Sequence, residues 1–420
     1  MQVQPKKPTN HEGFCCSHQL IIYYIHHTQN MLLSNRMLVK MGQRLAAGAS
    51  SNCRHASFEI SEPFKTYELP DAKMPTKASL TKEQGLQYYK DMQMIRRMET
   101  MSSNLYKEKF IRGFLHLYSG QEAIAVGMKA AMEPQDSIIT SYREHGWAYV
   151  MGVEPVGVLA ELTGRALGCS RGKGGSMHMY APNFYGGHGI VGAQCPLGAG
   201  VAFAHKYLED KGVCLTLYGD GAANQGQLYE AINMAKLWNL PCLFICENNL
   251  YGMGTSTDRS AANNEYYTRG HYIPGIQMDG MDVLAVREGT RFAMDICREG
   301  KGPIMIEAKA YRYHGHSMSD PGTSYRTREE VQKIRKSRDP INQLKSRMLD
   351  SGMASEAEFK GIDKEIKQIL EAASKKAKEA PEATDLYGDL YVKNLEGKLK
   401  GTTSMDYHDH QNIGKACNLD

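Results

Sequence analysis

The stretch from Val213 to Asn249 reads VCLTLYGDGAANQGQLYEAINMAKLWNLPCLFICENN and carries a strand–helix–strand pattern. The apolar run VCLTLY predicts one buried strand, and the run CLFIC predicts a second. Between them, Leu228, Ile232 and Ala235 recur four and three residues apart, which is the spacing of one helix face. Strands joined in this way become parallel neighbours with a right-handed crossover. The stretch therefore predicts an α/β fold with a parallel sheet.

The same stretch places two polar side chains where the predicted strands end. Asp220 and Asn249 should lie side by side at the carboxyl ends of the strands, where open α/β sheets bind ligands. Carboxylate and amide oxygens suit Mg²⁺, which is usually completed by phosphate oxygens and water. Gly219 and Gly221 let the backbone approach phosphate, and a helix starting near Asn224 directs its positive end there. The pattern predicts a diphosphate held through a metal ion.

Three other interpretations of the glycine-containing segments fit the sequence less well. A nicotinamide site needs G-x-G-x-x-G, but Asn224 stands at the third glycine position, and no acidic residue ends the second strand in the usual way. A P-loop over 168–174 fails, because too few residues separate the glycines and no Ser or Thr follows the lysine. An isolated G-D-G would indicate a turn without a ligand, but the later Asn248-Asn249 pair makes the pattern more specific.

Together, G-D-G and the following N-N resemble the thiamine diphosphate motif. Three further stretches extend the resemblance: GFLHLYSGQEA (113–123), GKGGSMHM (172–179) and YRYHGHSMSDPGTSYR (311–326). From about residue 88 to about residue 390 the chain is similar to alpha subunits of pyruvate dehydrogenase, in the family of thiamine diphosphate-dependent 2-oxoacid dehydrogenases. The resemblance implies a doubly wound, mostly parallel sheet of the thiamine diphosphate-binding type, with flanking helices and a helical C-terminal segment.

The resemblance implies thiamine diphosphate and Mg²⁺ as cofactors. The matching metal ligands are Asp220, Asn249 and the backbone oxygen of Tyr251, while Tyr142 and Arg143 match diphosphate contacts. The remaining implied cofactor contacts are His116, Ala181, Gly189, Val191, Gly221 and Ala222.

Two histidines are the catalytic candidates. His116 and His316 lie in loops that match the family, and imidazole ordinarily titrates near working pH, so we expect them to donate or orient protons. His314 and His316 could instead form half of a metal site, but no third ligand is evident in the sequence. The family usually has Asn where this chain has His188.

The implied reaction is the oxidative decarboxylation of pyruvate through hydroxyethyl-thiamine diphosphate, with acetyl transfer to the lipoyl group of an acyltransferase component. Thiamine enzymes also need a carboxylate against the aminopyrimidine, held in a second related domain. The sequence indicates one such sheet, so we expect a separate beta subunit, in a tetramer of two alpha and two beta chains. Two alternatives stay open: a branched-chain 2-oxoacid counterpart, which loop 313–322 resembles less, and a non-catalytic regulatory paralogue, which need not keep Asp220 and Asn249.

Three serines match positions at which the family is switched off by phosphorylation: Ser317, Ser324 and Ser256. The resemblance therefore implies a regulatory kinase and phosphatase as partners. A phosphoserine adds ~1.5–2 negative charges at pH 7, which at position 317 would face a bound diphosphate. The alternative is that these serines only cap turns.

The first 57 residues differ in composition from the rest. They contain one acidic residue, Glu12, against six basic ones, and are typical of a mitochondrial transit peptide, which predicts the mitochondrial matrix. A secretory signal or a disordered leader are the alternatives, and the apolar run 20–25 is too short to span a membrane. We expect a catalytic domain over 58–400 and a polar tail over 401–420. The near-neutral body gives no reason to expect nucleic acid, and the scattered cysteines predict no disulfide framework.

Overall fold

The computed structural model describes residues 55–69, 73–384, 388, 397–401, 403 and 405–409. The predicted leader therefore lies almost wholly outside the described residues, as does much of the predicted tail. Strand β1 (His55–Glu59) begins before residue 58, where we placed the start of the catalytic domain. No helix in the described ranges is both long and apolar enough to cross a membrane.

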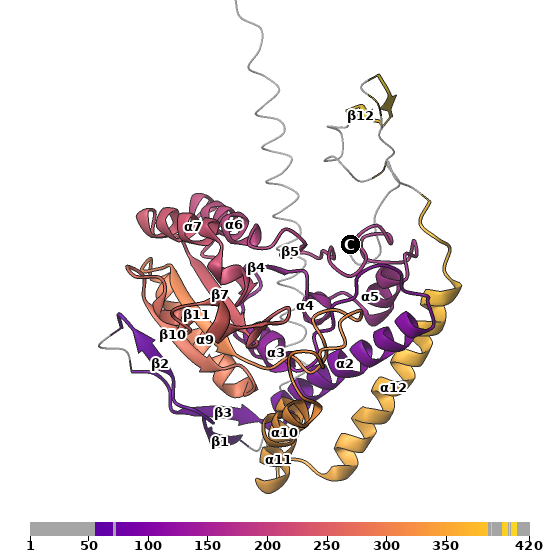
Figure 1. Ribbon diagram of the computed structural model, residues 1–420. Helices are drawn as coiled ribbons and strands as arrows, with labels where there is room; N and C mark the ends of the chain where they lie inside the picture. Colours follow the sequence, from indigo (N-terminus) through magenta and orange to yellow (C-terminus); the bar gives the residue numbers. More distant parts are fainter. Residues whose placement is uncertain are drawn as a thin grey trace, which may run out of the picture. The chain divides into compact units, whose positions relative to one another are not determined.

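A seven-stranded sheet forms the centre of the folded unit, in the order β2-β10-β11-β7-β6-β4-β5 (Figure 1). Strand β2 (Lys65–Tyr67) runs antiparallel to its neighbour, and the other strands run parallel. Those strands are β4 (Ser137–Ser141), β5 (Phe184–His188), β6 (Cys214–Gly219), β7 (Cys242–Asn248), β10 (Gly275–Asp279) and β11 (Ile304–Lys309). The predicted mostly parallel α/β fold, with β6 and β7 as neighbours, is confirmed.

Alternate residues of the strands point into two different cores, as the two-residue period of a strand requires. On one face, Cys242, Phe244 and Cys246 pack with α6 (Gln194–Leu208) and α7 (Gly226–Leu237). On the other, Leu243 and Ile245 pack with helices from both halves of the chain. These are α2 (Lys82–Lys107), α3 (Glu122–Ala131) and α9 (Val283–Arg298). The two cysteines are packing residues, and Phe244→Ala would cost about 3–5 kcal/mol of folding free energy.

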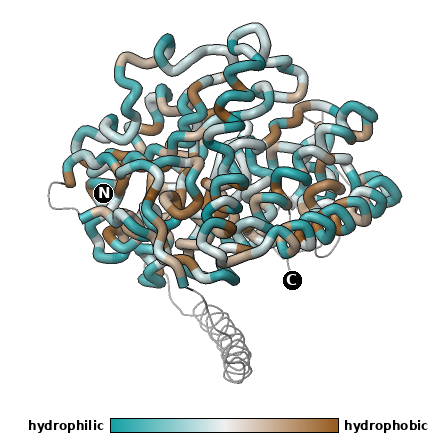
Figure 2. The backbone as a smooth tube through the Cα atoms, turned by 90° about the horizontal axis from the view of Figure 1, so that it is seen from below, coloured by the Kyte–Doolittle hydropathy of each residue, from teal (hydrophilic) through white to brown (hydrophobic). Residues whose placement is uncertain are grey.

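Helix α2 begins at a capping box. Thr81 and Gln84 form a capping box, each side chain accepting from the other residue's backbone N–H at 3.2 Å. Tyr88, Met92 and Ile95, spaced four and three residues apart on one face of the helix, are buried in the larger core. The methionine-rich stripe is therefore core. Figure 2 shows the hydrophobic stretches gathered inside the folded unit and the hydrophilic ones around it.

The predicted helical C-terminal segment consists of three helices: α10 (Arg328–Arg338), α11 (Pro340–Asp350) and α12 (Glu356–Glu379). Helix α10 buries no residue. The other two are amphipathic, since Met348 of α11 and Phe359 and Leu370 of α12 are buried in the core while other residues of these helices are exposed. Smaller elements are β3 (Lys77–Thr81), α4 (His145–Val150), α5 (Pro155–Leu162), η2 (Ala222–Asn224), β8 (Tyr251–Gly252), β9 (Thr255–Ser256), α8 (Thr257–Ser260), η3 (Tyr266–Thr268), β12 (Leu399–Lys400) and β13 (Tyr407–His408).

The glycine-rich segment that invited a P-loop interpretation wraps around a carboxylate of the chain itself. Glu161 of α5 accepts hydrogen bonds from the backbone amides of Ser170, Gly172, Gly174 and Gly175, at 2.7–3.1 Å. Successive backbone N–H groups of this kind bind anions. Because Glu161 already accepts hydrogen bonds from these amides, the segment anchors a loop and does not form a phosphate site.

Candidate active site

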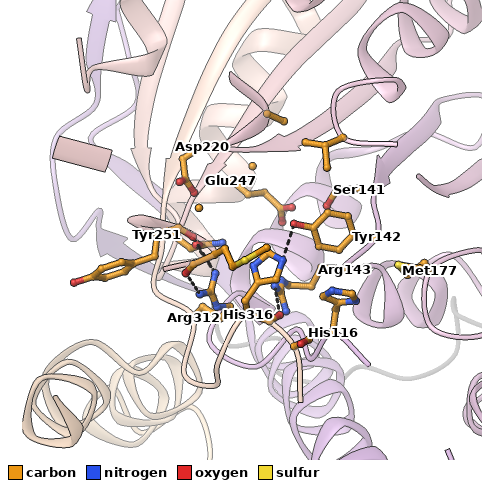
Figure 3. A pocket seen from close by; sticks show the side chains of 18 of the residues that line it. His116, Ser141, Tyr142, Arg143, Met177, Asp220, Glu247, Tyr251, Arg312 and His316 are labelled. Atoms are coloured by element: carbon orange, nitrogen blue, oxygen red, sulfur yellow. Dashed lines mark hydrogen bonds between the residues drawn. The ribbon is translucent and has the colours of Figure 1, made fainter. Parts of the chain in front are cut away.

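A cavity of about 820 Å³ lies at the carboxyl ends of the central strands (Figure 3). Residues at or just after the ends of β4, β6, β7 and β11 line it, which is where ligands bind in open parallel sheets. The structure brings together most of the sites predicted from the sequence: His116, Tyr142, Arg143, Gly189, Val191, Asp220, Gly221, Ala222, Asn249, Tyr251, His316 and Ser317. Ala181 is not in this lining; it pairs with Phe184 beside the sheet.

Asp220 presents a buried carboxylate to the cavity. Its Oδ2 atom has no hydrogen-bond partner, and burial raises the pKa of this carboxyl to about 6. The hairpin that holds Tyr251 lies against it, because a Cβ on Gly252 would be 3.5 Å from Asp220 Oδ2 and 3.4 Å from the Cα of Gly221. A buried carboxylate with a free oxygen is stabilised by a cation in contact with it.

Two further oxygens accept hydrogen bonds from one cationic side chain, that of Arg312. Nη1 of Arg312 donates to Asn249 Oδ1 at 3.1 Å and to the Tyr251 backbone oxygen at 3.0 Å (Figure 3). A carboxylate, an amide oxygen and a carbonyl oxygen therefore face one region of the cavity. This donor set fits Mg²⁺, which takes few protein ligands and completes its octahedron with phosphate oxygens and water.

A chain of amides decides which end of Asn249 faces the cation. Asn249 Nδ2 donates to Gln121 Oε1, and Gln121 Nε2 donates to Glu247 Oε1, each at 3.3 Å. Tyr118 Oη also donates to Glu247, at 2.5 Å. Burial raises the pKa of the Glu247 carboxyl to about 7. Gln121, Glu247 and Arg312 were not predicted as site residues, although Glu247 directly precedes the Asn pair at the strand end.

The two candidate histidines face each other across the cavity. The rings of His116 and His316 are 5.4 Å apart between centroids in an edge-on arrangement, and Tyr142 Oη lies 3.4 Å from His316 Nε2 (Figure 3). Burial, followed by the charge of Arg143, lowers the pKa of His116 to about 3 and that of His316 to about 4. The expectation that these imidazoles titrate near working pH is therefore wrong, because desolvation disfavours the imidazolium. At neutral pH both act as neutral hydrogen-bonding groups.

Backbone contacts bring the two histidine loops together. Tyr313 N donates to Ser119 O at 3.1 Å, and Met318 N donates to Leu115 O at 2.9 Å. Gly120 has a φ of +102°, and a Cβ there would lie 2.1 Å from the Tyr311 backbone oxygen. Only glycine fits this crossing, which explains why a glycine follows Ser119 in the sequence.

Arg143 joins both loops. Its Nη1 donates to Leu117 O at 2.7 Å, and its Nη2 donates to His316 O at 2.8 Å (Figure 3). The resemblance implied that Arg143 contacts a diphosphate. The residue does line the cavity, but its terminal nitrogens bond to backbone carbonyls beside the two histidines. Burial lowers the pKa of its guanidinium to about 10, so it remains charged at neutral pH.

The three candidate phosphorylation sites have different surroundings. Ser317 lines the cavity, with its Oγ 2.8 Å from Ser319 Oγ. Ser256 pairs with Tyr251 across the hairpin of β8 and β9. Ser324 is exposed and is not in the cavity lining.

Asp320 organises the loop that carries Ser317. Its carboxylate accepts from the backbone amides of His316 at 2.6 Å and Gly322 at 2.8 Å, and from Tyr325 Oη at 2.6 Å. These bonds outweigh the effect of burial and lower the pKa of Asp320. A new negative charge on Ser317 would arise beside this carboxylate.

The alternative metal site gains no support from the structure. Within the described ranges, no group of three or more His, Cys, Asp and Glu side chains could hold a metal, so the His314 and His316 pair has no third such ligand. His188, at the end of β5, lies outside the lining of the large cavity. Its Nε2 atom is buried with no hydrogen-bond partner, and burial lowers its pKa.

Comparisons with known proteins point to one family. Residues 90–385 match the model of a family described as dehydrogenase E1 component. The chain is 60% identical over 357 residues to the probable pyruvate dehydrogenase E1 component subunit alpha, mitochondrial, of Caenorhabditis elegans, covering 83% of this chain and 89% of that protein. It is 57% identical over 343 residues to the somatic form of the pyruvate dehydrogenase E1 component subunit alpha, mitochondrial, of Homo sapiens, covering 82% of this chain and 87% of that protein.

Proposed function

Because the chain belongs to the dehydrogenase E1 component family, we propose that it is the alpha subunit of a mitochondrial pyruvate dehydrogenase. The observation that carries this proposal is the convergence of Asp220, Asn249 and the Tyr251 backbone oxygen at the ends of β6 and β7. The relatives are named for pyruvate, which favours this substrate over a branched-chain 2-oxoacid. The complete donor set argues against a non-catalytic paralogue.

Different cavity residues would hold the metal ion and the diphosphate. Asp220, Asn249 and Tyr251 would hold Mg²⁺, and Gly221 and Ala222 bring backbone close to the diphosphate. Thiamine diphosphate, when bound, supplies an electron sink for the decarboxylation of a 2-oxoacid. Gln121 and Glu247 keep the amide oxygen of Asn249 directed toward the metal. Val191, 41% exposed, would support the shape of the bound cofactor.

The two histidines act on the substrate side of the cavity. Being neutral, His116 and His316 can each donate from one ring nitrogen and accept at the other. They would orient the oxygens of a bound 2-oxoacid and exclude water. Tyr142 contacts both rings and limits their movement.

Regulation by phosphate fits the placement of Ser317 and Ser256. Ser317 lies in the cavity wall directly after His316, and Ser256 faces Tyr251 across its hairpin. Phosphate on either serine would put negative charge beside a site built for a diphosphate. Ser324 lies on the same loop as Ser317, and a kinase and an opposing phosphatase would act on these positions.

The active enzyme would need a second chain. The described residues form one α/β sheet with one set of metal ligands, and the aminopyrimidine carboxylate is expected from a beta subunit, in a tetramer of two alpha and two beta chains. Acetyl would pass to the lipoyl group of an acyltransferase component. The mitochondrial names of the relatives support the predicted transit peptide and matrix location.

Co-expression with a beta subunit tests the proposed function. The chain alone should not decarboxylate pyruvate, and the co-expressed pair should do so when thiamine diphosphate and Mg²⁺ are present. The measurement is release of labelled CO₂ from pyruvate, with a branched-chain 2-oxoacid as the comparison substrate. Efficient decarboxylation by the isolated chain, or a preference for the branched-chain substrate, would refute the proposal.

A further inference from the structure

A buried chain of hydrogen bonds lies behind His116, among residues that the proposed function does not use. His145 Nδ1 lies 2.9 Å from Glu99 Oε2, and His145 Nε2 lies 2.9 Å from Ser176 Oγ. Ser176 Oγ in turn accepts from the backbone amide of His116 at 3.2 Å. Glu99 and His145 are 0% exposed and Ser176 is 5% exposed. These hydrogen bonds connect α2, α4 and the glycine-rich segment to the wall of the cavity.

The chemistry of the groups sets the direction of this chain. A carboxylate only accepts hydrogen bonds, so the neutral His145 tautomer that fits this site donates from Nδ1 to Glu99 and accepts at Nε2. The Ser176 oxygen accepts from the His116 amide, and its own proton is directed to His145 Nε2. Each link fixes the next, so Glu99 determines the orientation of the Ser176 hydroxyl that holds His116.

Three consecutive residues of the cavity wall are held through their backbones. Besides the bond from His116 to Ser176, Tyr118 N donates to Glu99 Oε1 at 2.8 Å. Between them, Leu117 O accepts from Arg143. Glu99 therefore acts on this segment twice, once directly and once through the chain. Fixing the backbone on both sides of residue 117 fixes where the His116 imidazole enters the cavity.

The order acid–imidazole–hydroxyl also occurs in hydrolases, where the hydroxyl is a nucleophile. Ser176 cannot serve that way here, because it is buried and does not line the cavity. Its oxygen is also engaged by the His116 amide. The neighbouring Met177 does reach the cavity, on the same side as His116 (Figure 3). The arrangement suits the positioning of a neighbour.

We propose that Glu99, His145 and Ser176 are positioning residues that place the His116 imidazole for the reaction. This inference rests on the proposed function, since it gives His116 a task in the pyruvate dehydrogenase site. None of the three residues lines the cavity, so they act only through His116. A misplacement of about 1 Å at a reacting group can reduce a rate up to ~100-fold, so loss of the Ser176 link affects turnover more than folding.

The protein contains a second series of hydrogen bonds that serves as a matched control. Asp210, His205 and Ser137 form the same order of groups, with His205 Nδ1 2.9 Å from Asp210 Oδ1 and His205 Nε2 2.8 Å from Ser137 Oγ. Ser137 lies at the start of β4, at the opposite end of the strand from Tyr142. None of the three lines the cavity. Ser137→Ala removes the same kind of bond without reaching His116.

The test compares Ser176→Ala and Ser137→Ala in the co-expressed complex, with and without His116→Ala. We expect Ser176→Ala to lower kcat for pyruvate about tenfold. Ser137→Ala should leave kcat unchanged, and the two variants should lower the thermal midpoint to a similar extent. In the His116→Ala background, Ser176→Ala should have no further effect on kcat, because the two residues act in series. Thiamine diphosphate binding, followed by calorimetry, should stay within about twofold of wild type in Ser176→Ala.

Two results would overturn the positioning role: an equal loss of kcat from Ser176→Ala in both backgrounds, or unchanged kcat in Ser176→Ala itself. Should Ser176→Ala fail to assemble, Ser176→Cys keeps the size and a weak acceptor, and its effect should likewise vanish in the His116→Ala background. A wild-type complex without pyruvate activity would refute the proposed function instead, so the two failures are distinguishable.

Discussion

The buried side chain of Arg312 connects the two halves of the site. The guanidinium of Arg312 donates to Asn249 and Tyr251 after β7 and also to Tyr325 on the loop after β11, at 3.0–3.3 Å. A carbonyl oxygen has two lone pairs, so an oxygen that Arg312 holds can still bind a metal ion. One side chain thereby holds the Asn249–Tyr251 segment and the Ser317 loop in register.

The metal assignment can be tested at Asp220. Asp220→Asn keeps the shape of the side chain but removes the charge that this chain offers to Mg²⁺. Loss of one unit charge in contact with a buried cation should weaken Mg²⁺ binding by about 100-fold or more. Calorimetric titration of the complex with Mg²⁺ and thiamine diphosphate measures the effect. Asp258→Asn, at an exposed aspartate of α8, is the control and should bind normally. Equal affinities in the two variants would rule out Asp220 as a metal ligand.

The phosphate switch can be tested at Ser317. Ser317→Glu places a negative charge in the cavity wall beside Asp320, and should reduce pyruvate turnover by about tenfold or more through repulsion of the diphosphate and disturbance of His316. Ser317→Ala should keep most activity. Ser337→Glu, on the exposed face of α10, controls for added charge. Treatment with a mitochondrial kinase and mapping by mass spectrometry would complete the test. Full activity with Ser317 stoichiometrically phosphorylated would show that no such switch exists.

At the level of elements, one buried aspartate ties helix α9 to the C-terminal helices. Asp282 caps α9 by accepting from Leu284 N at 3.0 Å, and it accepts from Arg347 of α11 through both carboxylate oxygens at 2.8 and 2.9 Å. It also accepts from Ser61 N. Burial alone would raise the pKa of this carboxyl, but the hydrogen bonds and charge of Arg347 outweigh it, and the pKa is lowered.

The lowered pKa of Asp282 makes its contribution depend on pH. Its folded pKa lies below the unfolded value of about 3.9, so its stabilisation is complete above that pH and is lost as the pH falls through the folded pKa. Asp282→Asn keeps a capping side chain but leaves Arg347 without its charge, and should cost about 2–3 kcal/mol at pH 7. Urea unfolding at pH 7 and below pH 4 measures this, with the difference from wild type shrinking at low pH. Glu371→Gln, in an exposed pair on α12, should have little effect at either pH. A cost independent of pH would contradict the argument.

At the level of the whole molecule, segments distant in sequence complete the folded unit. Strand β1 pairs with β3 ahead of α2, and the carbonyl of Glu59 accepts from Arg347 near the other end of the chain. Phe58 packs partly against the larger core. Strand β1, which begins before residue 58, therefore belongs to the folded unit, and we propose that the catalytic domain includes it.

Truncation tests this boundary. A chain that starts at residue 55 should melt like the full-length chain when each is paired with the beta subunit. A chain that starts at residue 61 loses β1 and the burial of Phe58, and should be less stable by about 2 kcal/mol. Differential scanning calorimetry compares the three chains. If removing residues 55–60 leaves the melting temperature unchanged, β1 contributes nothing to the fold.

Local sequence was enough for the central strand–helix–strand unit and for one half of the site. Continuous apolar runs predicted β6 and β7, and the strand–helix–strand order placed Asp220 beside Asn249, because parallel strands joined by a crossover end at the same edge of the sheet. The capping box of α2 is likewise a local feature, since its hydrogen bonds join residues three apart. The remaining site residues rested on the resemblance to a known family.

Only the tertiary structure decided the contacts that cross between elements. Arg312 reaches the oxygens of Asn249 and Tyr251 from a loop 61–63 residues further on, and Glu99 reaches His145 from another helix. The neutral state of His116 and His316 also depends on burial by distant segments. Hydrophobic periodicity reports which face of an element is buried, but not what lies against it. Desolvation and long-range hydrogen bonds depend on that packing, so a linear pattern could not reveal them.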